Sequence, residues 1–148
     1  MYLRKILFLF FILLLFACSK NEAVYKPTEK IDPFVLYKEG LEAFEKNDFF
    51  YASKKFSEAE LNFTKIELAA KSSIMSSYSL YGINFYDEAL ENLDSYLKKY
   101  PVDKNIAYAH YLIAIIYYEQ ISDEKKDLEP LLKTKDKIAF FLKEFPDN

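Results

Sequence analysis

A pattern of apolar residues repeats along this chain after 37 residues, and this repeat limits the possible folds more than any other feature. Within each copy the apolar residues are three, four or seven positions apart, which places them on one face of an α-helix. The matched residues are Phe49, Ala52, Phe56 and Phe63 in the first copy and Tyr86, Ala89, Leu93 and Tyr100 in the second, and a matched asparagine, Asn47 or Asn84, precedes each set. Two helices joined by a short turn cannot bury such faces alone, and a period of this length is typical of a helical solenoid.

Helix start and stop signals predict a repeat domain over residues 32–148. Asp32 followed by Pro33 predicts a helix start, because aspartate caps the first N–H groups and proline is tolerated at the first helical position. Pro101 and Pro146 each follow an aromatic residue and end a repeat, since proline disfavours a helical residue before it. We expect three repeats, at about 33–65, 67–101 and 105–146, the last lengthened by a charged insertion at 122–127. That insertion is either a solvated loop or a docking site for a partner.

The composition argues for an all-helical domain without a reaction centre. With only two glycines, the 148-residue chain lacks the material for β-hairpins and phosphate-binding loops. A net charge of −3 does not support nucleic-acid binding, which needs a basic face. No spacing of His, Cys, Asp or Glu matches a metal site, and the single histidine, His110, lies among tyrosines. We therefore predict no enzyme activity, no cofactor and no metal.

The N-terminus has the features of a secretory signal. Arg4 and Lys5 precede an apolar run over residues 6–17, which is too short to span a bilayer comfortably. The segment Leu15-Phe16-Ala17-Cys18 resembles the bacterial lipobox, in which the signal is cleaved before the cysteine and its thiol carries diacylglycerol. We predict a signal peptide at residues 1–17. The lipidated Cys18, with acyl chains such as palmitate, and a flexible tether would then occupy 18–31. The chain has no second cysteine for a disulfide.

The repeat resembles the tetratricopeptide repeat (TPR), with a small residue, a turn, an aromatic, an alanine and a closing proline. Three segments resemble the BamD (YfiO-like) family of TPR lipoproteins more specifically, namely 36–49, 96–101 and the tyrosine-rich 107–121. The resemblance implies an all-α, TPR-like solenoid of helical hairpins, anchored by lipid to the bacterial outer membrane and facing the periplasm. It also implies a role in the β-barrel assembly machinery. The implied partners are a BamA-like barrel protein, other lipoproteins of that machinery and unfolded outer-membrane proteins. Because the family has about five repeats, we expect the chain to be truncated after the third.

A binding role would fall to the concave face, which the first helix of each repeat lines. The TPR register places there Tyr37, Leu41, Phe44, Ile74, Tyr78, Tyr81, Tyr108 and Leu112. As a set these side chains suit an extended apolar or aromatic peptide, although each could equally belong to the core. A structural TPR lipoprotein that supports a pilus or cell-wall complex is the alternative function.

Overall fold

The computed structural model describes residues 31–121 and 128–147. Over these residues it has six helices and no strand, so the all-α prediction is confirmed. The helices are α2 (Pro33–Glu45), α3 (Phe49–Asn62), α4 (Ile66–Gly82), α5 (Tyr86–Lys99), α6 (Ile106–Glu119) and α7 (Glu129–Glu144). The predicted signal peptide, Cys18, the tether up to Lys30 and the charged insertion lie outside the described residues.

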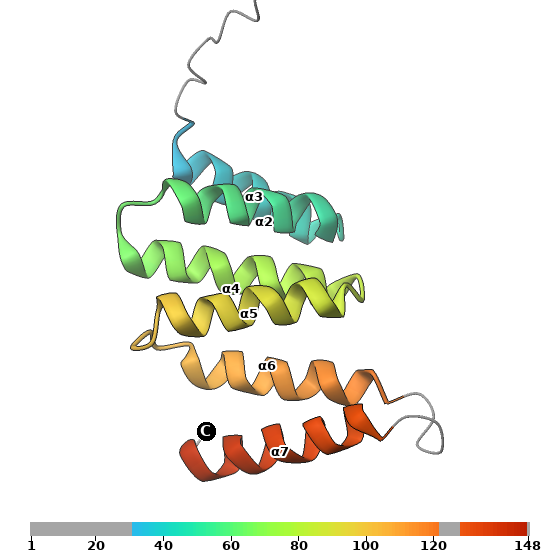
Figure 1. Ribbon diagram of the computed structural model, residues 1–148. Coiled ribbons are helices and arrows are strands. Elements are labelled where there is room, and N and C mark those ends of the chain that lie inside the picture. The colour runs from blue at the N-terminus through green and yellow to red at the C-terminus, as the bar shows by residue number, and fades with distance from the viewer. Residues whose placement is uncertain (1–30, 122–127, 148) are drawn as a thin grey trace, which may run out of the picture. The chain divides into compact units, whose positions relative to one another are not determined.

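The helices form three antiparallel hairpins, α2–α3, α4–α5 and α6–α7, stacked in chain order (Figure 1). Each helix packs against the next one along the chain, and α4 also contacts α6. Side chains of α2 also meet α4, where the Phe44 ring lies 5.7 Å from that of Tyr78, so the first helices of the hairpins, α2, α4 and α6, are neighbours. This is the TPR-like arrangement that the sequence repeat predicts. The first helix of the second hairpin begins at Ile66.

The turns within the first two hairpins have the same backbone geometry. Asn47 and Asn84 both have φ of 61°, in the left-handed region that few residues other than glycine and asparagine adopt readily. The N–H group after each asparagine bonds back to the preceding helix, from Asp48 to the carbonyl of Ala43 and from Phe85 to that of Leu80. This 6→1 bond is the Schellman ending of a helix, which satisfies carbonyls that would otherwise be unpaired. The recurring asparagine thus sets where each hairpin reverses.

Small residues mark the points where the two helices of a repeat cross. Ala52, Ala89 and Thr134 occupy the same position in α3, α5 and α7, and all three are buried. At Gly40 of α2 a Cβ atom would lie 2.8 Å from two carbons of the fully buried Phe56 ring. Glycine is therefore required there by the close approach of α2 to α3.

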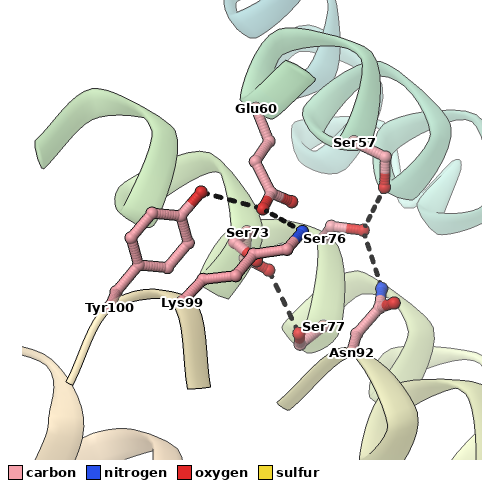
Figure 2. Close-up of polar contacts among 8 residues, drawn as sticks. All are labelled: Ser57, Glu60, Ser73, Ser76, Ser77, Asn92, Lys99 and Tyr100. Carbon is pink, nitrogen blue, oxygen red and sulfur yellow. Dashed lines mark hydrogen bonds and ion pairs between the residues drawn. The ribbon is translucent and has the colours of Figure 1, made fainter. Parts of the chain in front are cut away.

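Two apolar clusters form the core, and a polar seam lies between them. One cluster joins α2 and α3 around Phe56, and the larger one joins α4, α5 and α6 around Leu93 and Leu112. Where α3 meets α4, the hydroxyl of Ser76 lies 2.9 Å from that of Ser57 (Figure 2). The same hydroxyl donates to the Ser53 carbonyl at 3.1 Å. Serines are small enough to let these two helices approach closely, while their hydroxyls find partners on the facing helix or in their own backbone.

Glu60 links the first repeat to the end of the second. Its carboxylate accepts hydrogen bonds from Lys99 Nζ at 3.2 Å and from the Tyr100 hydroxyl at 2.9 Å (Figure 2). The turn between α5 and α6 is held in a similar way. The Asp103 carboxylate accepts hydrogen bonds from the hydroxyl of the buried Tyr96 and from the backbone N–H and side-chain amide of Asn105. These contacts fix the α5–α6 turn, from which part of the candidate site is built.

Candidate functional site

A concavity of about 510 Å³ is lined by residues from α2, α4 and the start of α6. Its lining residues are Phe44, Lys71, Ile74, Met75, Tyr78, Lys104, Asn105 and Tyr108. The first helices of all three repeats thus contribute, as expected for the concave face of a TPR array. We call this concavity the groove.

Aromatic rings form a continuous row along the groove. The Phe44 ring lies 5.7 Å from that of Tyr78, and the Tyr78 ring lies 6.4 Å from that of Tyr108 (centroid distances). Both tyrosines are 37% exposed, so each packs on its neighbours and still offers surface to a ligand. Burial, followed by the neighbouring tyrosines, raises the pKa of Tyr108 to about 12. Its hydroxyl is therefore neutral at physiological pH and can donate a hydrogen bond.

Two lysines give the groove positive charge. Lys71 Nζ lies 5.3 Å from the centroid of the Tyr37 ring, a cation–π contact that holds the ammonium beside the aromatic row. Lys104 comes from the α5–α6 turn, at the other side of the groove. No carboxylate is among the residues that line the groove. An apolar floor flanked by cations suits a peptide that carries apolar side chains and a carboxylate.

The structure brings half of the eight predicted groove residues together. Phe44, Ile74, Tyr78 and Tyr108 line the groove, although Ile74 is largely buried. Tyr81 is half-buried, with its ring 6.0 Å from that of Tyr78, and borders the larger apolar cluster.

The other three predicted residues lie mainly in the core. Tyr37 and Leu41 are half-buried and pack against the cluster around Phe56. Leu112 is only 2% exposed and packs within the larger cluster, so it offers almost no surface to a ligand. The TPR register identified the correct helices but could not separate their groove-facing positions from those that pack against the second helix.

Sequence reasoning missed Lys71, Met75, Lys104 and Asn105 as groove residues. Lys71 and Met75 lie about one helical turn from Ile74 and Tyr78, and this i, i+3/i+4 spacing was a signal that could have identified them. Lys104 and Asn105 follow Pro101 in a stretch that the sequence marks only as a connection.

Among the residues that the structure describes, no three His, Cys, Asp or Glu side chains are close enough to hold a metal ion. No helix of the described part of the chain is long and apolar enough to cross a bilayer. The centroid of the His110 ring lies 4.8 Å from that of Phe140 and 5.7 Å from that of Phe145. His110 therefore helps to join α6 to α7.

The last helix, α7, has an apolar stripe that is only partly covered. Phe141 packs against Tyr111 and Phe145 against His110, both on α6. Ile138 and Leu142 remain exposed. In the two earlier repeats the position of Ile138 holds Phe56 and Leu93, both fully buried against a following helix.

Comparison with known proteins identifies the family. Residues 29–148 match the YfiO family, described as an outer membrane lipoprotein. The outer membrane protein assembly factor BamD of Rickettsia prowazekii (strain Madrid E) is 30% identical over 112 residues, which cover 76% of this chain and 45% of that protein. The outer membrane protein assembly factor BamD of Caulobacter vibrioides is 33% identical over 93 residues, which cover 63% of this chain and 30% of the relative. The chain thus spans less than half the length of these relatives. The family match covers all the described residues and agrees with the resemblance seen in the sequence, so the chain belongs to the YfiO (BamD) family of outer-membrane lipoproteins.

Proposed function

We propose that this protein is a lipid-anchored, non-catalytic adaptor of outer-membrane β-barrel assembly, which captures unfolded barrel proteins in its groove. Acyl chains on Cys18 would hold it on the periplasmic side of the outer membrane. There it would act together with a BamA-like barrel protein and the other lipoproteins of the machinery. The observation that carries the proposal is the row formed by Phe44, Tyr78 and Tyr108, which stays partly exposed in a groove between three repeats.

The groove suits an extended, amphipathic segment. Strands of outer-membrane barrels alternate apolar and polar residues, so an unfolded strand can place every second side chain on the aromatic row. Lys71 and Lys104 would attract an acidic side chain or the terminal carboxylate of such a segment. Binding needs no bond chemistry, and release to the next subunit requires only a competing surface.

The test is a titration of a fluorescently labelled peptide, copied from the terminal strand of an outer-membrane barrel, against purified protein. Central aromatic side chains of an interface contribute about 2 kcal/mol each when truncated, so Tyr78→Ala with Tyr108→Ala should weaken binding by at least ~30-fold. Tyr81 is a poorer choice because it borders the core. The matched control is Tyr51→Ala, an exposed tyrosine on α3.

Circular dichroism should show equal helix content in all three proteins. Equal affinity in the groove variant and the control would place the binding site elsewhere. A wild-type protein that binds no such peptide would instead favour the structural-scaffold function.

A further inference from the structure

One end of the repeat domain carries exposed apolar side chains from three elements. Val102, in the α5–α6 turn, is 96% exposed, Ile66 at the start of α4 is 61% exposed and Phe34 in the first turn of α2 is 59% exposed. Ile66 and Val102 line the same hollow of about 300 Å³. The Phe34 ring packs edge-on against Phe63, at the end of α3, with 5.1 Å between centroids. The start of α2 and the turns after α3 and α5 lie at one end of the stacked helices (Figure 1).

Exposed lysines lie next to the apolar side chains of this end. Lys65 precedes Ile66, Lys98 lies near the end of α5 before Val102, and Lys104 follows Val102 and also lines the groove. The exposed carboxylates at this end are Asp32 and Glu67 and, at the end of α7, Glu144 and Asp147. Apolar side chains flanked by lysines are the combination that binds the interface of a phospholipid bilayer, where the lysines meet lipid phosphates.

The position of the lipid anchor points to the bilayer as the occupant of this end. The chain enters the domain at Ile31, just before α2, and thirteen Cα–Cα steps separate this position from Cys18. Such a segment spans at most about 47 Å when fully extended. The opposite end of the domain lies farther from the entry point by the length of a helix, about 20 Å for the 13 residues of α2. The apolar end is therefore the nearer of the two ends to the anchor.

We propose that the end formed by Phe34, Ile66 and Val102 rests on the phospholipid surface, with Val102 and Ile66 in the headgroup region. This inference depends on the lipid anchor of the proposed function. The contact would set the orientation of the whole domain, because all its helices end on this surface. It would hold the helices upright on the bilayer, with one end of each helix at the membrane, and would keep the groove open to the periplasm.

The experiment uses the acylated full-length protein in vesicles of phosphatidylethanolamine with a minor share of phosphatidylglycerol. Acylation consumes the thiol of Cys18, so Val102→Cys supplies the only free thiol for an environment-sensitive fluorophore. The matched control is Phe85→Cys, an exposed apolar residue in the α4–α5 turn at the other end. We expect the Val102 label to shift its emission to shorter wavelength and to be quenched by lipid-attached quenchers. The Phe85 label should show neither change.

The outcomes separate this inference from the anchor itself. Protein that floats with the vesicles but keeps its Val102 label accessible to a water-soluble quencher would overturn the membrane contact and leave the anchor intact. Protein that does not float, or that takes up two labels per chain, would overturn both the anchor and the contact.

Discussion

The close approach of α2 to α3 predicts that Gly40→Ala destabilises the protein, although alanine is the better helix former. The added Cβ would lie 2.8 Å from Cδ1 and Cε1 of Phe56, against about 3.5–4.0 Å for a normal carbon contact. The ring cannot withdraw freely, because it is fully buried and packs against Tyr37 with 5.2 Å between centroids. Overpacking of this kind destabilises by about 1–3 kcal/mol. Alanine regains about 1 kcal/mol of helix propensity, which leaves a net loss of up to about 2 kcal/mol.

The other glycine provides the control. A Cβ at Gly82, the last residue of α4, would lie 3.4 Å from the Phe49 ring, an ordinary contact, and the backbone there has no positive φ. Gly82→Ala should therefore be neutral or stabilise by a few tenths of a kcal/mol, about the helix-propensity gain at a helix end. The free energy of unfolding is measured by urea titration with circular dichroism, in a Cys18→Ser background that carries neither lipid nor thiol.

The second repeat suggests how the clash is relieved. At the positions of Gly40 and Phe56 it has Ser77 and Leu93, which are both buried. A residue larger than glycine there faces a residue smaller than phenylalanine. Phe56→Leu should make room for the new methyl group, so the double variant should be less destabilised than the sum of the single variants by about 1–3 kcal/mol. If Gly40→Ala is as stable as Gly82→Ala and shows no coupling to Phe56→Leu, the packing described here is wrong.

Three further predictions follow from single contacts. Asn84→Ala should lower the free energy of unfolding by about 1–2 kcal/mol, because alanine lacks the tolerance of asparagine for the left-handed backbone at φ 61°, and Asn84→Gly should not. Tyr100→Phe should lower it by about 1–2 kcal/mol by removing the hydrogen bond to Glu60, which calorimetry or urea unfolding can measure. Burial, helped by Lys137, lowers the pKa of His110. The unfolded chain then binds more protons below pH ~6.5, so stability should fall as the pH drops from about 6.5 towards 5. With His110→Gln, the free energy of unfolding measured with urea should change little between about pH 6.5 and 5, because histidine is the only side chain that normally titrates in this range and the chain has one histidine.

The helices and their order could be predicted from the sequence because several local signals agree. Apolar spacing identified the helix faces, Asn47 and Asn84 marked the turns, and Pro101 ended a repeat. The alanines at 52 and 89, which recur in the repeat, lie at the helix crossings, where only a small side chain fits. Each of these signals depends on residues close together in the chain, which is why one sequence was sufficient.

The seam between the first two repeats could not be predicted in this way. Ser72, Ser76 and Ser77 are buried, although serines in a helix normally indicate a solvated face. They are buried because α3 approaches α4 closely and Ser53 and Ser57 supply partners for Ser76, a contact between residues about twenty positions apart. The helix α4 therefore has small or apolar residues on most of its surface, and its sequence alone does not show which side faces the groove.

The same limit explains the mixed outcome at the groove. Leu112 and Tyr108 lie one helical turn apart on α6, yet Leu112 is buried in the core and Tyr108 is exposed in the groove. Lys104 reaches the groove only because hydrogen bonds to Asp103 fix the turn after α5. Such placement depends on how three helices and a turn meet, which local patterns do not encode.

Site-specific photo-cross-linking in living cells tests the central proposal most directly. A photoreactive amino acid would replace Tyr78 in the groove or, as the matched control, Tyr51 on α3, in the lipidated protein. We predict that irradiation links position 78, but not position 51, to unfolded outer-membrane barrel proteins, and that the adducts disappear when barrel synthesis is stopped. Equal adducts at both positions, or none at position 78 in a folded, membrane-bound protein, would contradict capture by the groove.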